Sequence, residues 1–125
     1  MSEVDRSEWT TSQHTMEINL NRLVGKTIKE HLGGRTFCVM TGAKNFVLLN
    51  YYGAHKGGGL TFTVGRNSKR VNRVSVLYDA ASDLYIMEFG RVWGSNYKVL
   101  EKVEGVYFDQ LQSVFTTHTG LETRL

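Results

Sequence analysis

Two stretches of the chain repeat their apolar residues at the spacing of one helix face. The first begins after Thr15 and comprises Met16, Leu20, Leu23, Val24, Ile28 and Leu32. Thr15 is the expected N-cap, and the pair Gly33 and Gly34 supplies the left-handed residue that commonly ends a helix. The second stretch begins at Val106 and stops at Gly120. The sequence therefore predicts one helix near each end of the chain.

Between these helices, short runs have the composition of strands. Residues 36–41 and 46–52 are rich in β-branched and aromatic residues and flank a turn-like stretch at 42–45, which predicts a hairpin. Four further runs of this kind lie between turn-like segments, and in the first two apolar and polar residues alternate. These predicted strands are 60–65, 74–78, 84–89 and 97–103.

The order of the elements predicts a fold class. A helix, a series of strands with short connections and a final helix indicate an α+β protein. We expect a single antiparallel sheet of five or six strands in a meander, with the N- and C-terminal helices packed on one face. Residues 1–13 show no period and are expected to be a flexible lead-in to a single domain at 14–125. Because the chain has no proline to guard its edge strands, a homodimer through a sheet edge is also expected.

Composition places the chain among ordinary globular proteins. It has 125 residues, of which 41% are hydrophobic and 22% charged, and this suits one domain with a real core. No apolar run approaches the roughly 20 residues of a membrane span, and the first residues are polar and acidic rather than typical of a signal peptide. The lone Cys38 is expected to be a buried structural thiol in a reducing compartment. A cytoplasmic protein with no membrane partner is therefore expected.

The residues that usually carry catalysis do not form a recognisable pattern. The four histidines stand far apart from one another and from Cys38, so neither a metal site nor a cysteine–histidine pair is indicated. The acidic pairs Asp79 with Asp83 and Glu101 with Glu104 lie at turns, where solvated carboxylates are common. In the glycine-rich stretch 53–59 the lysine precedes the three consecutive glycines and a strand follows, which predicts a mobile hairpin loop rather than a Walker phosphate loop. We expect a protein that is not an enzyme and has no cofactor.

The positive charge of the chain is concentrated in its middle. The formal net charge is +3, yet no acidic residue lies between Glu30 and Asp79. The basic residues of that stretch are Arg35, Lys44, Lys56, Arg66, Lys69, Arg70 and Arg73. Because the flanking parts of the chain are net negative, this asymmetry points to a partner that the middle stretch binds.

The segment GRNSKRVNR at 65–73 is the strongest candidate for that binding surface. Four of its residues are basic, and Asn67, Ser68 and Asn72 can also bond phosphate oxygens. If folding brings further basic residues and two tyrosines beside this segment, they would form one basic face with an aromatic rim, and the sequence does not determine whether they share that face. The candidate site residues are Lys44, Asn45, Tyr51, Tyr52, Lys56, Arg66, Lys69, Arg70 and Arg73.

Three stretches carry a resemblance to a known family. They are MTGAKNF at 40–46, YIMEFG at 85–90 and EGVYFDQLQSVFTTHTGLETRL at 104–125. In these stretches the chain resembles a family of small uncharacterised proteins from bacteriophages and integrated mobile elements. The resemblance implies an accessory gene of a phage or prophage that acts in the cytoplasm of a bacterial host. It implies no catalytic residues.

Two functional hypotheses follow. The first is a non-enzymatic module that binds nucleic acid through the basic hairpin, mainly by phosphate contact and with weak sequence specificity. The alternative is an inhibitor of a host defence system, of the anti-CRISPR or anti-restriction type, that acts by protein–protein binding. It would use the same basic tip or an aromatic patch of residue types common at binding hot spots. That patch comprises Tyr51, Tyr52, Trp93 and Tyr97.

Overall fold

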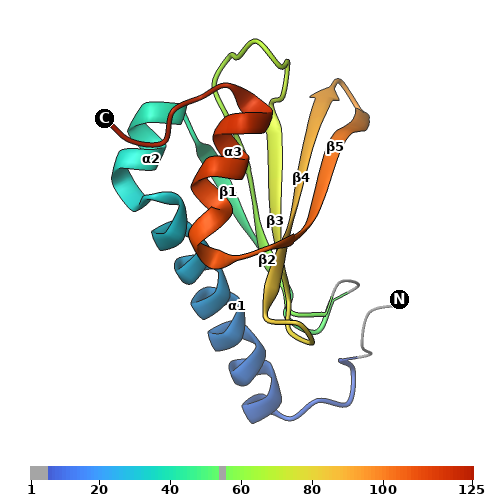
Figure 1. Ribbon diagram of the computed structural model, residues 1–125. Helices are drawn as coiled ribbons and strands as arrows, with labels where there is room; N and C mark the ends of the chain where they lie inside the picture. The colour runs from blue at the N-terminus through green and yellow to red at the C-terminus, as the bar shows by residue number, and fades with distance from the viewer. Residues whose placement is uncertain (1–5, 54–55) are drawn as a thin grey trace.

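The computed structural model describes residues 6–53 and 56–125. Its centre is one five-stranded antiparallel sheet in the order β1-β2-β3-β4-β5, with helices before and after it (Figure 1). The elements are α1 (Thr11–Leu32), α2 (Gly34–Thr41), β1 (Lys44–Leu49), β2 (Gly59–Thr63), β3 (Arg73–Asp79), β4 (Leu84–Trp93), β5 (Asn96–Val106), a 3₁₀ turn η1 (Phe108–Gln110) and α3 (Leu111–Thr119). The predicted α+β class and the meander of the sheet are confirmed.

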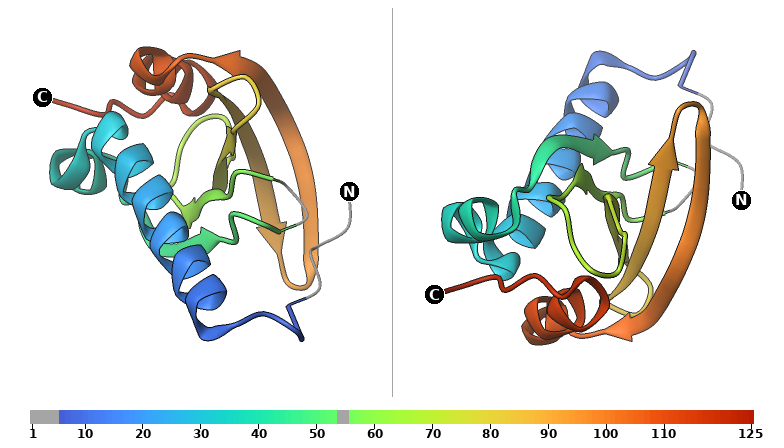
Figure 2. Two further views of the ribbon diagram at one scale, coloured as in Figure 1. Left: turned by 90° about the horizontal axis from the view of Figure 1, so that it is seen from below. Right: turned by 90° about the horizontal axis from the view of Figure 1, so that it is seen from above.

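The helices lie on one side of the sheet, and no helix of the described chain covers its other face (Figure 2). Helix α1 packs on β1 and β2, whereas α3 packs on β4 and β5. The alternation of apolar and polar residues decides which face is covered, because successive strand residues point to opposite faces. The covered face contributes Leu60, Phe62, Val74, Val76, Tyr85, Met87 and Phe89 to the core.

Among the described helices, none has the length and apolarity that a membrane span requires.

Helix α1 begins earlier than its apolar spacing indicates. Its N-cap is Thr10 rather than the predicted Thr15, so the last three residues of the expected lead-in, 11–13, are helical. Thr10 accepts a hydrogen bond from the backbone of Gln13, and the side chain of Gln13 accepts one from the backbone of Thr10. This reciprocal capping box is formed by polar residues alone, and for this reason the apolar period does not reveal it. Residues 1–5 lie outside the described residues.

The N-terminal segment is tied to α1 and to the β1–β2 loop through Glu17. Both carboxylate oxygens of Glu17 accept hydrogen bonds of 2.7 Å from Arg6, and the backbone N–H of Tyr52 donates to the same carboxylate. Trp9 packs edge-on against the ring of Tyr52, with 5.8 Å between the ring centroids. The bidentate bond to Arg6 is the main cause that lowers the pKa of Glu17 below its ordinary value of 4.5.

Replacing Glu17 by Gln is expected to lower the free energy of unfolding at pH 7 by about 1–3 kcal/mol, because a buried charged acceptor is lost. The pKa of Glu17 is lower in the folded protein than in the unfolded protein, so its carboxylate stabilises the fold at pH values above the unfolded pKa. This stabilisation is lost as the pH falls through the folded pKa. The two proteins should therefore converge in acid, once Glu17 is protonated. Urea unfolding at pH 7 and in acid checks this, and a gap that persists in acid would show that the carboxylate charge is not its cause.

The predicted strand at 36–41 is wrong: these residues belong to helix α2. Gly33 and Gly34 both have positive φ and turn the chain sharply after α1. In the helix, Phe37 and Thr41 share one buried face, and the hydroxyl of Thr41 donates to the carbonyl of Phe37 at 2.7 Å. Burial of Phe37 among the helices outweighs the strand propensity of the segment, since propensity is weaker than tertiary packing. The predicted hairpin of 36–41 with 46–52 is therefore absent, and β1 pairs with β2 instead.

The second predicted helix also begins at a different residue. Val106 is the last residue of β5, and α3 begins at Leu111 after the 3₁₀ turn. The predicted stop at Gly120 is confirmed, because Gly120 is left-handed and donates to the carbonyl of Thr116. The edge strands of the sheet are β1 and β5. Dimerisation through one of these edges remains a prediction.

Candidate nucleic-acid interface

The sheet separates the predicted site residues into two groups. The β1–β2 loop joins one end of β2 and the connector at 64–72 joins the other, so the two lie at opposite ends of a five-residue strand (Figure 1). At about 3.4 Å per residue, that strand holds them roughly 17 Å apart. The group at the connector end comprises Lys44, Asn45, Arg66, Lys69, Arg70 and Arg73, whereas Tyr51, Tyr52 and Lys56 lie at the other end. The nine residues therefore do not gather at one end of the sheet.

The connector is an ordered loop because two asparagines bond within the protein. The amide of Asn67 donates to the carbonyls of Gly65 and Val71 and accepts from the backbone of Val71. Val71 is itself buried, which anchors the loop to the core. The expectation that Asn67 bonds phosphate oxygens is thus corrected, since its amide is already occupied. Arg70 has a positive φ of 62°, which completes the turn and keeps its side chain exposed.

The second asparagine attaches the connector to β4. The side chain of Asn72 donates to the carbonyl of Val92 at 2.8 Å and accepts from the Val92 N–H at 2.7 Å. Its backbone N–H donates to Gly90, and the guanidinium of Arg91 donates to the carbonyl of Arg70. Asn72 is therefore also unavailable to phosphate. These bonds hold the connector and the tip of the β4–β5 hairpin together as one unit.

This arrangement gathers basic side chains that are distant in sequence. Lys44, Thr63, Arg73 and Gly90 are successive partners in one row across four strands, and Lys98 is the partner of Arg91 one residue further along β4. We call the resulting cluster the basic end: Lys44, Arg66, Lys69, Arg70, Arg73, Arg91 and Lys98. Within the described residues none of these cations forms an ion pair with a carboxylate. Sequence reasoning missed Arg91 and Lys98, although the connection between the predicted strands 84–89 and 97–103 places both beside the connector in a meander.

On the uncovered face, Arg73 and Tyr97 lie next to each other. Arg73 donates to the hydroxyl of Thr61 at 3.1 Å, and its row partner is Gly90. The ring of Tyr97 lies over Gly90, where an added Cβ would come within 2.5 Å of the ring. The phenol donates to Glu88 at 3.0 Å. Burial and this bond raise the pKa of Tyr97 to about 12, so the phenol stays neutral at pH 7.

The opposite end of the sheet is not an open stacking surface. The rings of Tyr51 and Tyr52 are half-buried and pack edge-on against each other, with 5.1 Å between the centroids. The N–H of Tyr51 donates to Asn21 in α1, so the backbone here is bound to the helix. Lys56 is exposed at this end and is the one basic residue among the predicted site residues there. The exposed aromatic residues nearest the basic end are instead those of the β4–β5 hairpin, Trp93 and Tyr97.

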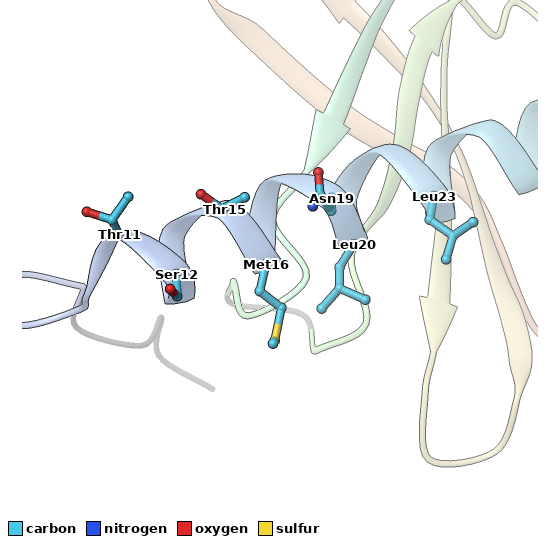
Figure 3. Close-up of a pocket in the computed structure, with 7 residues that line it drawn as sticks. All are labelled: Thr11, Ser12, Thr15, Met16, Asn19, Leu20 and Leu23. Atoms are coloured by element: carbon cyan, nitrogen blue, oxygen red, sulfur yellow. The ribbon is translucent and has the colours of Figure 1, made fainter.

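A separate apolar stripe runs along the first half of α1. Met16, Leu20 and Leu23 project to the same side of the helix and line a shallow groove (Figure 3). Met16 is 58% and Leu23 61% exposed. The groove lining contains no charged residue. The stripe lies on α1, whereas the basic end is formed by the strands and the connector.

The comparisons with known proteins give no further assignment. No protein-family model, curated protein or solved structure matches the chain. Within residues 6–53 and 56–125, no three histidine, cysteine, aspartate or glutamate side chains are placed to share a metal ion. The geometry of the basic end is therefore the feature from which a function is inferred.

Proposed function

We propose that the protein binds nucleic acid through phosphate contacts at the basic end, with weak sequence specificity. It acts without catalysis, as an accessory protein of a phage or mobile element in the cytoplasm of the bacterial host. The resemblance of three stretches to phage and prophage proteins supports this setting. The binding role is supported by the structure of the basic end itself.

The convergence of seven cations that have no carboxylate partner in the described chain is the observation that carries the proposal. Like charges repel, so their collection at one end of a small sheet opposes folding unless a partner neutralises them. Nucleic acid is the partner that gains most, because each phosphate contact releases condensed counterions. Arg66, Lys69 and Arg70 are all exposed. The guanidinium groups among these cations suit phosphate oxygens, which they can bind with two parallel hydrogen bonds.

The rigidity of the basic end also favours binding. Asn67 and Asn72 fix the connector, and Arg91 joins it to the hairpin. A surface that is already ordered loses less conformational entropy when it binds. The cations are therefore presented on a fixed backbone rather than on a loose chain.

The salt dependence of binding tests the proposal. Labelled oligonucleotides, single-stranded and duplex DNA and RNA, are titrated with the protein and followed by fluorescence anisotropy. If about five of the cations contact phosphates, affinity should fall roughly 100-fold or more between about 50 and 200 mM salt. Affinity that does not change with salt, or no binding at the lowest salt, would contradict the proposal.

The apolar stripe of α1 favours a second candidate function, the inhibition of a host protein by direct binding. Exposed apolar side chains in a continuous stripe are typical of protein interfaces, and Met16 and Leu23 have no partner in the described chain that covers them. The salt titration separates the two candidates. A protein that binds no nucleic acid at low salt would leave the stripe as the better functional surface.

A further inference from the structure

Two aromatic side chains stand exposed at the tip of the β4–β5 hairpin, within the basic end. Trp93 is the last residue of β4, and Tyr97 lies across the turn as the partner of Val92. Their side chains are 49% and 44% exposed. Neither ring packs against another aromatic ring of the described chain, whereas both tyrosines at the opposite end do. Exposed aromatic rings beside unpaired cations are the combination that binds bases and phosphates together.

Tyr97 is held in place as a platform. Its ring rests on Gly90, the one residue type that leaves room for it there, and its hydroxyl is fixed by Glu88 at 3.0 Å. One side of the ring is thus covered by the sheet while the remainder faces solvent. An aromatic ring that is already immobilised loses little side-chain entropy when a base stacks on it.

A cation lies at the correct place to hold the backbone of a stacked nucleotide. Arg73 is the cross-strand partner of Gly90, and directly opposed residues project from the same face of a sheet. The guanidinium of Arg73 therefore lies on the same open face as the ring of Tyr97. Arg91 and Lys98, at the next pair of positions, project from the opposite face because successive strand residues alternate, and Trp93 projects from that face too.

This inference rests on the proposed function: the geometry points to single-stranded nucleic acid as the ligand of the basic end. Bases stack on Tyr97 at the open face and on Trp93 at the other face of the hairpin tip, and phosphates bind the cations adjacent to each ring. The faces of paired bases are already stacked inside a duplex, so a duplex offers these rings nothing to stack on. A single strand offers every base, whatever its identity, which agrees with weak sequence specificity.

The test uses Trp93 as its own reporter. The chain has two tryptophans, and Trp9→Phe leaves Trp93 as the only one. Three probes of equal length are compared: oligothymidylate, a DNA duplex and an abasic deoxyribose-phosphate oligomer. We expect saturable quenching of Trp93 fluorescence by oligothymidylate. The abasic oligomer, which keeps the phosphates but has no bases, should bind at least roughly 5-fold more weakly.

Substitutions separate stacking from charge. Because Trp93→Ala removes the reporter, the variants are compared by the fluorescence anisotropy of labelled oligomers. Trp93→Ala and Tyr97→Ala should each weaken oligothymidylate binding at least roughly 5-fold and leave binding of the abasic oligomer unchanged. Tyr97→Phe keeps the ring and should retain most of the affinity. Tyr107→Ala is the matched control, because it removes a 56% exposed ring that follows the other end of β5.

Each outcome has a distinct meaning. Equal affinity for the strand, the duplex and the abasic oligomer, with no effect of the alanine substitutions, would overturn the single-strand inference and leave phosphate binding intact. Tighter binding of the duplex than of oligothymidylate would also overturn the single-strand inference and leave phosphate binding intact. If none of the three probes binds at low salt, both the proposed function and this inference fail.

Discussion

The double substitution Arg66→Glu and Arg70→Glu is expected to reduce nucleic-acid binding by roughly 1,000-fold at about 50 mM salt, because juxtaposed like charges oppose binding by several kcal/mol. Both side chains are exposed on the connector, so neither contributes to the core. The change removes two cations that would bind phosphates and places two carboxylates against the phosphate backbone. The salt dependence of any residual binding should also become shallower, by about one unit of slope for each of the two substituted cations.

A matched control separates this local effect from net charge. Arg22→Glu with Lys26→Glu lowers the net charge by the same four units, from +3 to −1, on exposed positions of α1. Within the described residues, the ion pair of Lys26 is an exposed one with Glu30, at 4.0 Å, which contributes little to stability. Fluorescence anisotropy on both variants gives the comparison, and circular dichroism confirms that they are folded. An equal loss of binding in the two variants would show that the basic end is not the binding surface.

The substitution Phe115→Ala is expected to lower the free energy of unfolding by about 3–5 kcal/mol, a large part of the stability of a typical domain. Phe115 is fully buried, and its ring packs edge-on against Phe37 with 4.9 Å between the centroids. It also lies 6.5 Å from the ring of Phe89 in β4. Removing the ring therefore leaves a cavity where α2, α3 and the sheet meet. Urea unfolding at constant pH measures the loss.

Phe108→Ala provides the comparison for the core variant. The side chain of Phe108 is 56% exposed and its ring contacts only the ring of His31 among the aromatic residues described. Its removal should change the free energy of unfolding by less than about 1 kcal/mol. If the two variants unfold at the same denaturant concentration, Phe115 is not at the centre of the core.

The difference between correct and incorrect local predictions has a physical basis. The strands could be predicted because Leu60, Phe62 and Val64 alternate with polar residues, and alternation follows from the geometry of any strand with one covered face. The segment 36–41 could not, because its β-branched residues favour a strand and only the burial of Phe37 makes it a helix. The N-cap at Thr10 was missed because a capping box involves polar residues that have no apolar period.

The candidate site was predicted in part for a related reason. The basic connector is contiguous, so its charges are visible in the sequence and lie together in the structure. The predicted strand at 60–65 already implies that the residues before it and those after it lie at opposite ends of the sheet. This separates Tyr51 and Lys56 from the connector. Arg91 and Tyr97 join the connector only through hydrogen bonds and strand register.

By itself, the sequence determined the class of the fold, the order of the strands and the concentration of positive charge in the middle of the chain. These follow from local periodicity, short connections and composition, each of which acts over a few residues. The tertiary structure alone decided that 34–41 is helical, that Asn67 and Asn72 bond inside the protein, and that Arg73 lies beside Tyr97. Each of these depends on contacts between segments distant in sequence, whose free energy no local pattern contains.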